Sequence, residues 1–168
     1  MIKDNFTSPN NLAIEGRSAG GLLIGAVLNL RPDLFKVAFM GVPFVDVINT
    51  MMDETIPLTV NEYDEWGNPN DKEYFDAMLA YSPYDNIRAG VKMPHIFIRA
   101  GLNDPRVQYW EPAKYVAKLR KVMDLSHGHQ LLLKTDMGAG HFGTTGRYSY
   151  LKDVAYEYSF IVHFLLNK

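Results

Sequence analysis

Short apolar segments alternate with longer helical segments along this chain, and this alternation limits the fold more than any other feature of the sequence. The segments typical of strands are residues 12–14, 37–40, 95–100 and 131–133. The segments typical of helices are residues 18–30, 72–81, 109–123 and 150–166. Strands that are apolar on both faces and separated by helices predict a parallel sheet covered on both sides. We therefore expect an α/β fold with about four parallel strands.

Length and composition narrow the class of protein. The chain has 168 residues, of which 47% are hydrophobic, so residues 1–168 are expected to form a single domain with a buried core. A net charge of −2 argues against a nucleic-acid partner, and no apolar run reaches the ~18 residues of a membrane span. Cysteine is absent, which excludes disulfides and a cysteine nucleophile. We expect no cofactor and no metal. Because no signal peptide is visible, a cytoplasmic location is expected, with the periplasm as the alternative.

The turn between the first strand and the first helix reads Gly16-Arg17-Ser18-Ala19-Gly20. This G-x-S-x-G pattern is typical of a nucleophile turn, in which glycines permit a tight bend that exposes the serine Oγ at a helix N-terminus. Ser18 is therefore the predicted nucleophile, and the Ala19 N–H is a predicted oxyanion donor. Two alternatives remain, a serine that only caps the helix and a phosphate-binding loop. The second is disfavoured because no Lys follows the glycines.

A serine nucleophile needs a base and an acid, which in this fold class follow the serine in the order acid, then His. Asp104 lies directly after the strand at 95–100, and His141 lies in a glycine-rich loop after the strand at 131–133. We predict Asp104 as the acid and His141 as the base, since catalytic groups gather at the carboxyl ends of parallel strands. Asp136 is a rival acid because it also follows a strand. His127-Gly128-His129 has the spacing of a metal pair but no evident carboxylate partner.

Several motifs resemble one known family. Gly16-Arg17-Ser18-Ala19-Gly20-Gly21-Leu22-Leu23 is similar to the nucleophile region of the prolyl oligopeptidase family of serine peptidases. The match extends over nearly the whole chain and is closest to a subfamily that cleaves peptides after basic residues. The stretches that carry it are Pro43-Phe44-Val45-Asp46-Val47, Asp53-Glu54-Thr55-Ile56-Pro57-Leu58-Thr59, Glu62-Tyr63-Asp64-Glu65-Trp66-Gly67-Asn68-Pro69, Tyr81-Ser82-Pro83-Tyr84-Asp85-Asn86 and Val107-Gln108-Tyr109-Trp110-Glu111-Pro112-Ala113-Lys114.

The resemblance implies an α/β-hydrolase fold, a Ser18–Asp104–His141 triad and hydrolysis of short peptides on the carboxyl side of Arg or Lys through an acyl-enzyme. It also implies that Glu62 and Asp64 bind the basic side chain of the substrate and that Arg106 contacts a substrate carbonyl. Two carboxylates can accept the fork of a guanidinium group, although Asp64 is shorter than the Glu usual there. Arg17 replaces the glycine usual at its position, and we expect this difference to leave the triad unaffected.

The resemblance further implies that these residues correspond to the C-terminal part of a catalytic domain. The family's β-propeller, the first strands of its sheet and a tyrosine that is the second oxyanion donor all precede this region. We therefore expect the chain alone to turn over substrate weakly or not at all. We also expect it to self-associate or to pair with the N-terminal part. Two alternative functions remain, a small esterase of the same fold and a noncatalytic fragment that needs a partner.

Overall fold

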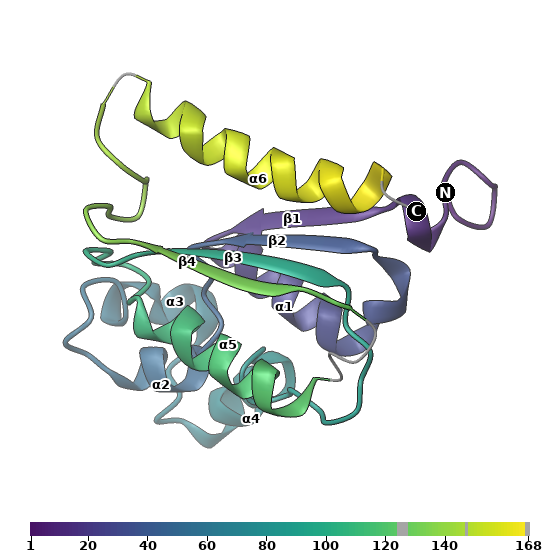
Figure 1. The fold of residues 1–168 in the computed structure, drawn as a ribbon. Coiled ribbons are helices and arrows are strands. Elements are labelled where there is room, and N and C mark those ends of the chain that lie inside the picture. Colours follow the sequence, from purple (N-terminus) through teal and green to yellow (C-terminus); the bar gives the residue numbers. More distant parts are fainter. Residues whose placement is uncertain (124–127, 147, 167–168) are drawn as a thin grey trace.

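The strands of the computed structural model, which describes residues 1–123, 128–146 and 148–166, form one sheet. In chain order they are β1 (Ala13–Arg17), β2 (Val37–Gly41), β3 (His95–Gly101) and β4 (Leu131–Asp136). Their order across the sheet is the same as in the chain, and every neighbouring pair is parallel (Figure 1). The parallel sheet predicted from the alternation of apolar and helical segments is therefore confirmed.

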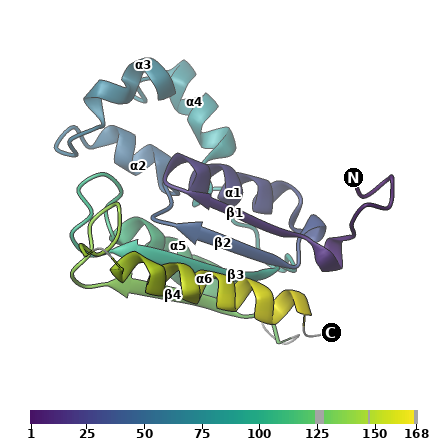
Figure 2. The same cartoon turned by 90° about the horizontal axis from the view of Figure 1, so that it is seen from above.

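Helices cover both faces of this sheet (Figures 1 and 2). The long helix α6 (Ser149–Leu166) lies over one face, and α1 (Ala19–Leu30) and α5 (Trp110–Val122) lie under the other. Shorter helices connect β2 to β3 on the side of α1 and α5, namely α2 (Val47–Met52), α3 (Tyr63–Trp66) and α4 (Lys72–Tyr81). Single 3₁₀ turns occur at Pro9–Asn11, Pro32–Leu34 and Val60–Glu62. Within the described ranges, no helix has the length and apolar character needed to cross a membrane.

The alternation of side chains along the central strands produces two apolar layers. Val37 and Phe39 of β2 face α6, where Phe160 packs with them. Met40, the neighbour of Phe39 in β2, faces the opposite way and belongs to the larger core under α1 and α5. All five residues of β2 are buried, whereas the edge strands β1 and β4 are partly exposed. A strand in the middle of a doubly covered sheet has this pattern because both of its faces are shielded from water.

Two features differ from the sequence-based expectations. The outer strands run further than their apolar segments, since β1 includes Gly16 and Arg17 and β4 continues to Asp136. Backbone pairing drives this extension, because Arg17 pairs with Gly41 whatever its side chain is. The short helices α2 and α3 were not predicted, since helices of six and four residues carry too few turns to show a period.

The segment that follows β2 is fastened to α5 by Glu111, a fully buried carboxylate. One oxygen of Glu111 accepts hydrogen bonds from the backbone N–H groups of Val45 and Asp46, each at 3.1 Å, and the other accepts from Thr50 Oγ1 at 2.6 Å. Asp46 is also buried and pairs with Lys114 Nζ at 2.5 Å. Burial raises the pKa of Glu111 from 4.5 to about 7, against the opposing effect of its three donors.

This raised pKa predicts a pH-dependent contribution of Glu111 to stability. Below pH 4.5 the residue is protonated in both the folded and the unfolded state, and its favourable contribution is complete. As the pH rises from 4.5 to about 7, the unfolded chain loses the proton first, so this contribution declines. The loss amounts to roughly 3 kcal/mol, since each pKa unit corresponds to about 1.4 kcal/mol.

Glu111→Gln removes this titration while keeping the shape of the side chain. The free energy of unfolding of the variant minus that of wild type should therefore increase by up to roughly 3 kcal/mol between pH 4.5 and pH 7.5. Urea denaturation at the two pH values measures the difference. Glu15→Gln, which alters an exposed carboxylate on β1, is the matched control and should change much less. A Glu111→Gln difference that does not vary with pH would contradict this account.

Candidate active site

Ser18 occupies a strained turn between β1 and α1. Its backbone has φ 53° and ψ −123°, and a positive φ is rare for a residue with a side chain. The Ser18 N–H donates to the Gly41 carbonyl at 2.9 Å, which ties the turn to the end of β2. A Cβ at position 16 would lie 2.3 Å from the Gly20 carbonyl oxygen, so the close approach of α1 to β1 requires Gly16. The local geometry is that of a nucleophile turn, with the serine held in an uncommon conformation by its surroundings.

His141 connects Ser18 to Asp104. The Nε2 atom of His141 lies 3.1 Å from Ser18 Oγ, and its Nδ1 atom lies 2.8 Å from Asp104 Oδ2. The Asp104 side chain is fully shielded and that of His141 is 8% exposed. This pattern fits a neutral imidazole that donates from Nδ1 to the carboxylate and accepts the serine hydroxyl at Nε2. The structure thus brings together three residues that lie far apart in the sequence and that were predicted from it.

Asp104 is itself held in place by the loop that follows β3. Its Oδ1 atom accepts hydrogen bonds from the backbone N–H groups of Arg106 at 2.8 Å and Val107 at 3.0 Å. With Oδ1 occupied in this way, Oδ2 faces the imidazole. The carboxylate therefore fixes the orientation of the His141 ring and would stabilise a positive charge on it.

Asp136, the rival acid, is engaged elsewhere. Its Oδ2 atom pairs with Arg99 at 2.6 Å, and its Oδ1 atom contacts Lys134. Burial alone would raise the pKa of Asp136, but hydrogen bonds from Arg99 and Lys134 outweigh burial and lower it. The carboxylate that reaches His141 is that of Asp104.

A pocket of about 120 Å³ opens beside Ser18. Its lining combines the apolar side chains of Phe44, Met51 and Trp66 with the polar groups of Glu62, Glu65 and Arg106. Ala19 also lines it and is the first residue of α1, so its N–H is one of the helix's first four, which have no partner within the helix. An oxygen bound next to Ser18 could therefore accept a hydrogen bond from Ala19.

The acidic side of this pocket differs from the sequence-based assignment in one residue. Glu62 lines the pocket, and one of its oxygens accepts from Trp66 Nε1 at 2.8 Å. Asp64 and Glu65 are both exposed, but Glu65 is part of the lining and Asp64 is not. Positions 62, 65 and 66 share one face because they are three and four residues apart in the helical segment that includes α3, and position 64 points away from that face. Helical spacing was the signal that could have identified Glu65.

The other predicted residues lie as follows. Arg106 forms part of the pocket wall, and its guanidinium carbon is 5.1 Å from the centre of the Phe142 ring. His127 of the suggested metal pair lies outside the described residues, while His129 stacks on His95 with ring centres 5.0 Å apart. In the part of the chain that the structure describes, no three histidine or carboxylate side chains converge as metal ligands.

Residues 1–168 match the prolyl oligopeptidase family. The chain is 53% identical to Protease 2 of Moraxella lacunata over 162 residues, which are 96% of this chain and 23% of the relative. It is 50% identical to dipeptidyl aminopeptidase BI of Pseudoxanthomonas mexicana over 163 residues, 96% of this chain and 22% of the relative. The chain therefore spans less than a quarter of the length of the curated relatives it matches.

Solved structures give the same result. Oligopeptidase B of Trypanosoma brucei, with covalently bound antipain, superposes with a TM-score of 0.94 at 54% identity, over 99% of this chain and 23% of that one. Oligopeptidase B of Leishmania major gives a TM-score of 0.93 at 54% identity, over 98% and 22%. The sheet and its helices thus correspond to part of an α/β-hydrolase catalytic domain, as the sequence motifs predict. Together, the family match over residues 1–168 and these superpositions establish that the chain belongs to the prolyl oligopeptidase family.

Proposed function

We propose that this chain carries the catalytic triad of a serine oligopeptidase that hydrolyses short peptides after Arg or Lys. The observation that carries the proposal is the continuous line of hydrogen-bonding atoms from Ser18 Oγ through His141 to Asp104, with separations of 3.1 Å and 2.8 Å. These are hydrogen-bond distances, as a nucleophile, base and orienting acid require. The covalent antipain in the similar Trypanosoma brucei oligopeptidase B is consistent with a nucleophile in this part of the fold.

The proposed reaction begins when Ser18 Oγ attacks the carbonyl carbon of the scissile bond and His141 Nε2 takes the serine proton. The resulting oxyanion accepts a hydrogen bond from the Ala19 N–H at the positive end of α1. His141 then gives its proton to the leaving amine, which leaves an acyl group on Ser18. A water molecule, deprotonated by His141, attacks this ester, and His141 returns the proton to Ser18 Oγ as the acid is released. Asp104 holds the imidazole tautomer and stabilises its charged form throughout.

The pocket beside Ser18 supports a substrate with a basic side chain. Glu62 has one oxygen bound to Trp66, and its second oxygen has no hydrogen-bond partner within the described ranges. An incoming guanidinium or ammonium group can bind that oxygen, with Glu65 as the second carboxylate of the lining. Arg106, on the same wall, supplies a donor for a carbonyl of the peptide. We therefore assign the basic-residue preference to Glu62 and Glu65, while Asp64 remains the assignment that the sequence motifs suggest.

We expect turnover by the chain alone to be slow. Ala19 is the backbone oxyanion donor identified within residues 1–123, and the family resemblance places a second donor, a tyrosine, outside this chain. Loss of one such donor commonly reduces the rate by about 10² to 10³. Strand β1 also lies at the edge of the sheet, and an open strand edge favours pairing with another chain.

One relative supports a second reaction of the same chemistry. The similarity to a dipeptidyl aminopeptidase favours the removal of dipeptides from a free N-terminus. Arginyl amide substrates with blocked and with free N-termini distinguish the two reactions. Hydrolysis of the blocked substrate supports an oligopeptidase, and exclusive hydrolysis of the free dipeptidyl substrate supports the second reaction.

Substitutions of the proposed nucleophile and its partners test the triad. Ser18→Ala should abolish covalent labelling by a fluorophosphonate probe, because Oγ is the atom that attacks the phosphorus. His141→Ala should slow labelling by about 10² to 10⁴-fold through loss of the general base. Asp104→Asn should lower turnover by about 10⁴-fold, the size of effect seen when the acid of a comparable triad is replaced. Labelling is followed by intact mass, which also reports the stoichiometry.

Ser8→Ala is the matched control, because Ser8 precedes a 3₁₀ turn and its hydroxyl makes no capping hydrogen bond. It should be labelled at the wild-type rate. Labelling that survives in Ser18→Ala, or a folded wild-type chain that is never labelled, would overturn the proposed role of Ser18 and favour a noncatalytic fragment. Efficient cleavage of simple esters without cleavage of arginyl amides would indicate an esterase instead.

Substitutions of the carboxylates in the pocket test the proposed preference for a basic side chain. Glu62→Gln should raise KM for an arginyl substrate about tenfold and leave kcat nearly unchanged, because a charge-assisted hydrogen bond contributes about 1.5–3 kcal/mol. Glu65→Gln should have a smaller effect in the same direction. Asp64→Asn is the internal control, since that carboxylate is exposed and outside the lining. Steady-state kinetics with arginyl and with norleucyl substrates measures the preference. A larger effect of Asp64→Asn than of either Glu substitution would reject this assignment.

A further inference from the structure

A row of basic residues crosses the sheet just below the candidate triad. The strand register aligns Arg17 of β1 with Gly41 of β2, Gly41 with Arg99 of β3, and Arg99 with Lys134 of β4. In-register residues of neighbouring strands point to the same face, which here is the face covered by α6. Three of the four positions therefore place a positive charge beneath that helix, at the end of the sheet where the strands run into the site loops.

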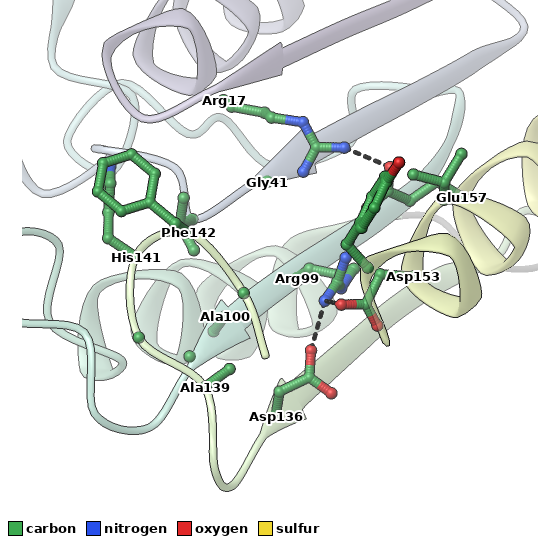
Figure 3. A pocket seen from close by; sticks show the side chains of 16 residues that line it. Arg17, Gly41, Arg99, Ala100, Asp136, Ala139, His141, Phe142, Asp153 and Glu157 are labelled. Atoms are coloured by element: carbon green, nitrogen blue, oxygen red, sulfur yellow. Dashed lines mark hydrogen bonds and ion pairs between the residues drawn. The ribbon is translucent and has the colours of Figure 1, made fainter. Parts of the chain in front are cut away.

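Helix α6 supplies the opposite charges to this row (Figure 3). Asp153 and Glu157 are four residues apart and lie on the same side of the helix. Arg99 pairs with Asp153 at 2.7 Å, with Glu157 at 2.6 Å and with Asp136 at 2.6 Å. Lys134 contacts Asp136 and lies 3.8 Å from Asp153. The cluster thus has three cations and three carboxylates, and the charges within it balance.

Glu157 joins the two arginines of this cluster. One of its oxygens binds Arg99 Nη1, and the other binds Arg17 Nη2. The Glu157 side chain is only 5% exposed, while that of Arg17 is 50% exposed. Gly41 makes the contact sterically feasible, because a Cβ there would lie 2.9 Å from Arg17 Cγ and 2.8 Å from its Nη1. We call the Arg17–Glu157–Arg99 connection the carboxylate bridge.

The carboxylate bridge lies next to the residues of the candidate triad. Arg17 is the last residue of β1 and directly precedes Ser18. Arg99 is on β3, and the loop that follows β3 carries Asp104. Asp136, bound to Arg99, ends β4 and begins the loop that carries His141. The cluster therefore connects the ends of all three strands from which the triad residues emerge.

A cavity of about 230 Å³ lies between the cluster and the His141 loop. Its wall includes Arg17, Arg99 and Glu157 on one side and residues 139–143 on the other (Figure 3). Because this space lies beneath the loop, tight apolar packing does not by itself determine the position of His141 there. The start of the loop is held by backbone hydrogen bonds, from Leu102 N–H to the Asp136 carbonyl and from Asn103 N–H to the Ala139 carbonyl, and the ionic contacts at the strand ends add to them.

We propose that the carboxylate bridge is a positioning element that holds Ser18 at reacting distance from His141. The inference rests on the proposed function of the triad and extends it to residues that do not touch substrate. A buried ionic cluster is often no more stabilising than an apolar replacement, so the contribution that we assign to the carboxylate bridge is directional geometry rather than stability. Arg17, expected from the sequence to be neutral for the triad, becomes one of its positioning residues.

Arg17→Met is the most direct test. The substitution keeps an aliphatic side chain over Phe39, on which the Arg17 guanidinium lies at 4.9 Å, and removes the link to Glu157. Since Arg17 is half exposed, the variant should remain folded, which thermal unfolding verifies. In fluorophosphonate labelling we expect kinact to fall about tenfold to a hundredfold with KI unchanged, as for a misplaced reacting group. Arg17→Lys, which can still reach a carboxylate, should recover part of the loss.

The matched control is Arg31→Met, because Arg31 forms an exposed pair with Asp33 at 2.7 Å, at the opposite end of α1 from Ser18 and outside both cavity linings. It should label at the wild-type rate. Glu157→Gln weakens the contacts with both Arg17 and Arg99, so it should lower kinact at least as much as Arg17→Met does. The double variant should be no slower than Glu157→Gln alone, because Arg17 acts through Glu157. An unchanged kinact in Arg17→Met, or an equal decrease in Arg31→Met, would overturn the inference.

A measurement that does not require turnover separates this inference from the proposed function. The ¹⁵N chemical shift of His141 Nε2 reports whether the nitrogen accepts the Ser18 hydroxyl. It should move in Arg17→Met toward the value in Ser18→Ala, and stay in place in Arg31→Met. If wild type is not labelled, the proposed function fails, and this shift still decides the inference. An Nε2 shift that is the same in wild type and Arg17→Met rejects the positioning role in either case.

Discussion

Parallel pairing of the strands in chain order is the constraint on which the rest of the structure depends. Because every neighbouring pair is parallel, all four carboxyl ends meet at one edge of the sheet. The loops that follow β1, β3 and β4 therefore bring Ser18, Asp104 and His141 together although they are far apart in the sequence. The same register places Arg17, Gly41 and the charged residues beyond them in one row directly below.

Two buried carboxylates hold the surroundings of the nucleophile in a similar way on opposite faces of the sheet. On the side of α5, Glu111 accepts from two backbone N–H groups and a hydroxyl and fixes the segment that leads to the pocket. On the side of α6, Glu157 binds Arg17 and Arg99. Both carboxylates are buried, and burying a carboxylate is costly unless hydrogen-bond donors replace the lost water. Here both oxygens of each carboxylate have such donors.

The sequence predicted the elements whose signals are local. The apolar runs identified the four strands, and the glycines around Ser18 identified the turn. It left Asp104 and Asp136 as alternatives because both follow strands. The pairing of Asp136 with Arg99 decides between them, and that contact joins residues 37 positions apart. Glu65 of the pocket lining was not predicted, because the family resemblance indicated Asp64 and the helical segment that places Glu65 beside Glu62 was not predicted either. The contact between Glu157 and Arg99 could not be predicted either, since neither residue lies near Ser18 in the sequence.

The contact between Gly41 and Arg17 has a consequence for substitutions at position 41. A side chain at position 41 would occupy the space that Arg17 needs to reach Glu157. Positions 17 and 41 are therefore coupled: a side chain at position 41 would displace Arg17 from the path that it takes to Glu157. A substitution at position 41 should therefore act on Glu157 through Arg17, although residue 41 itself carries no charge.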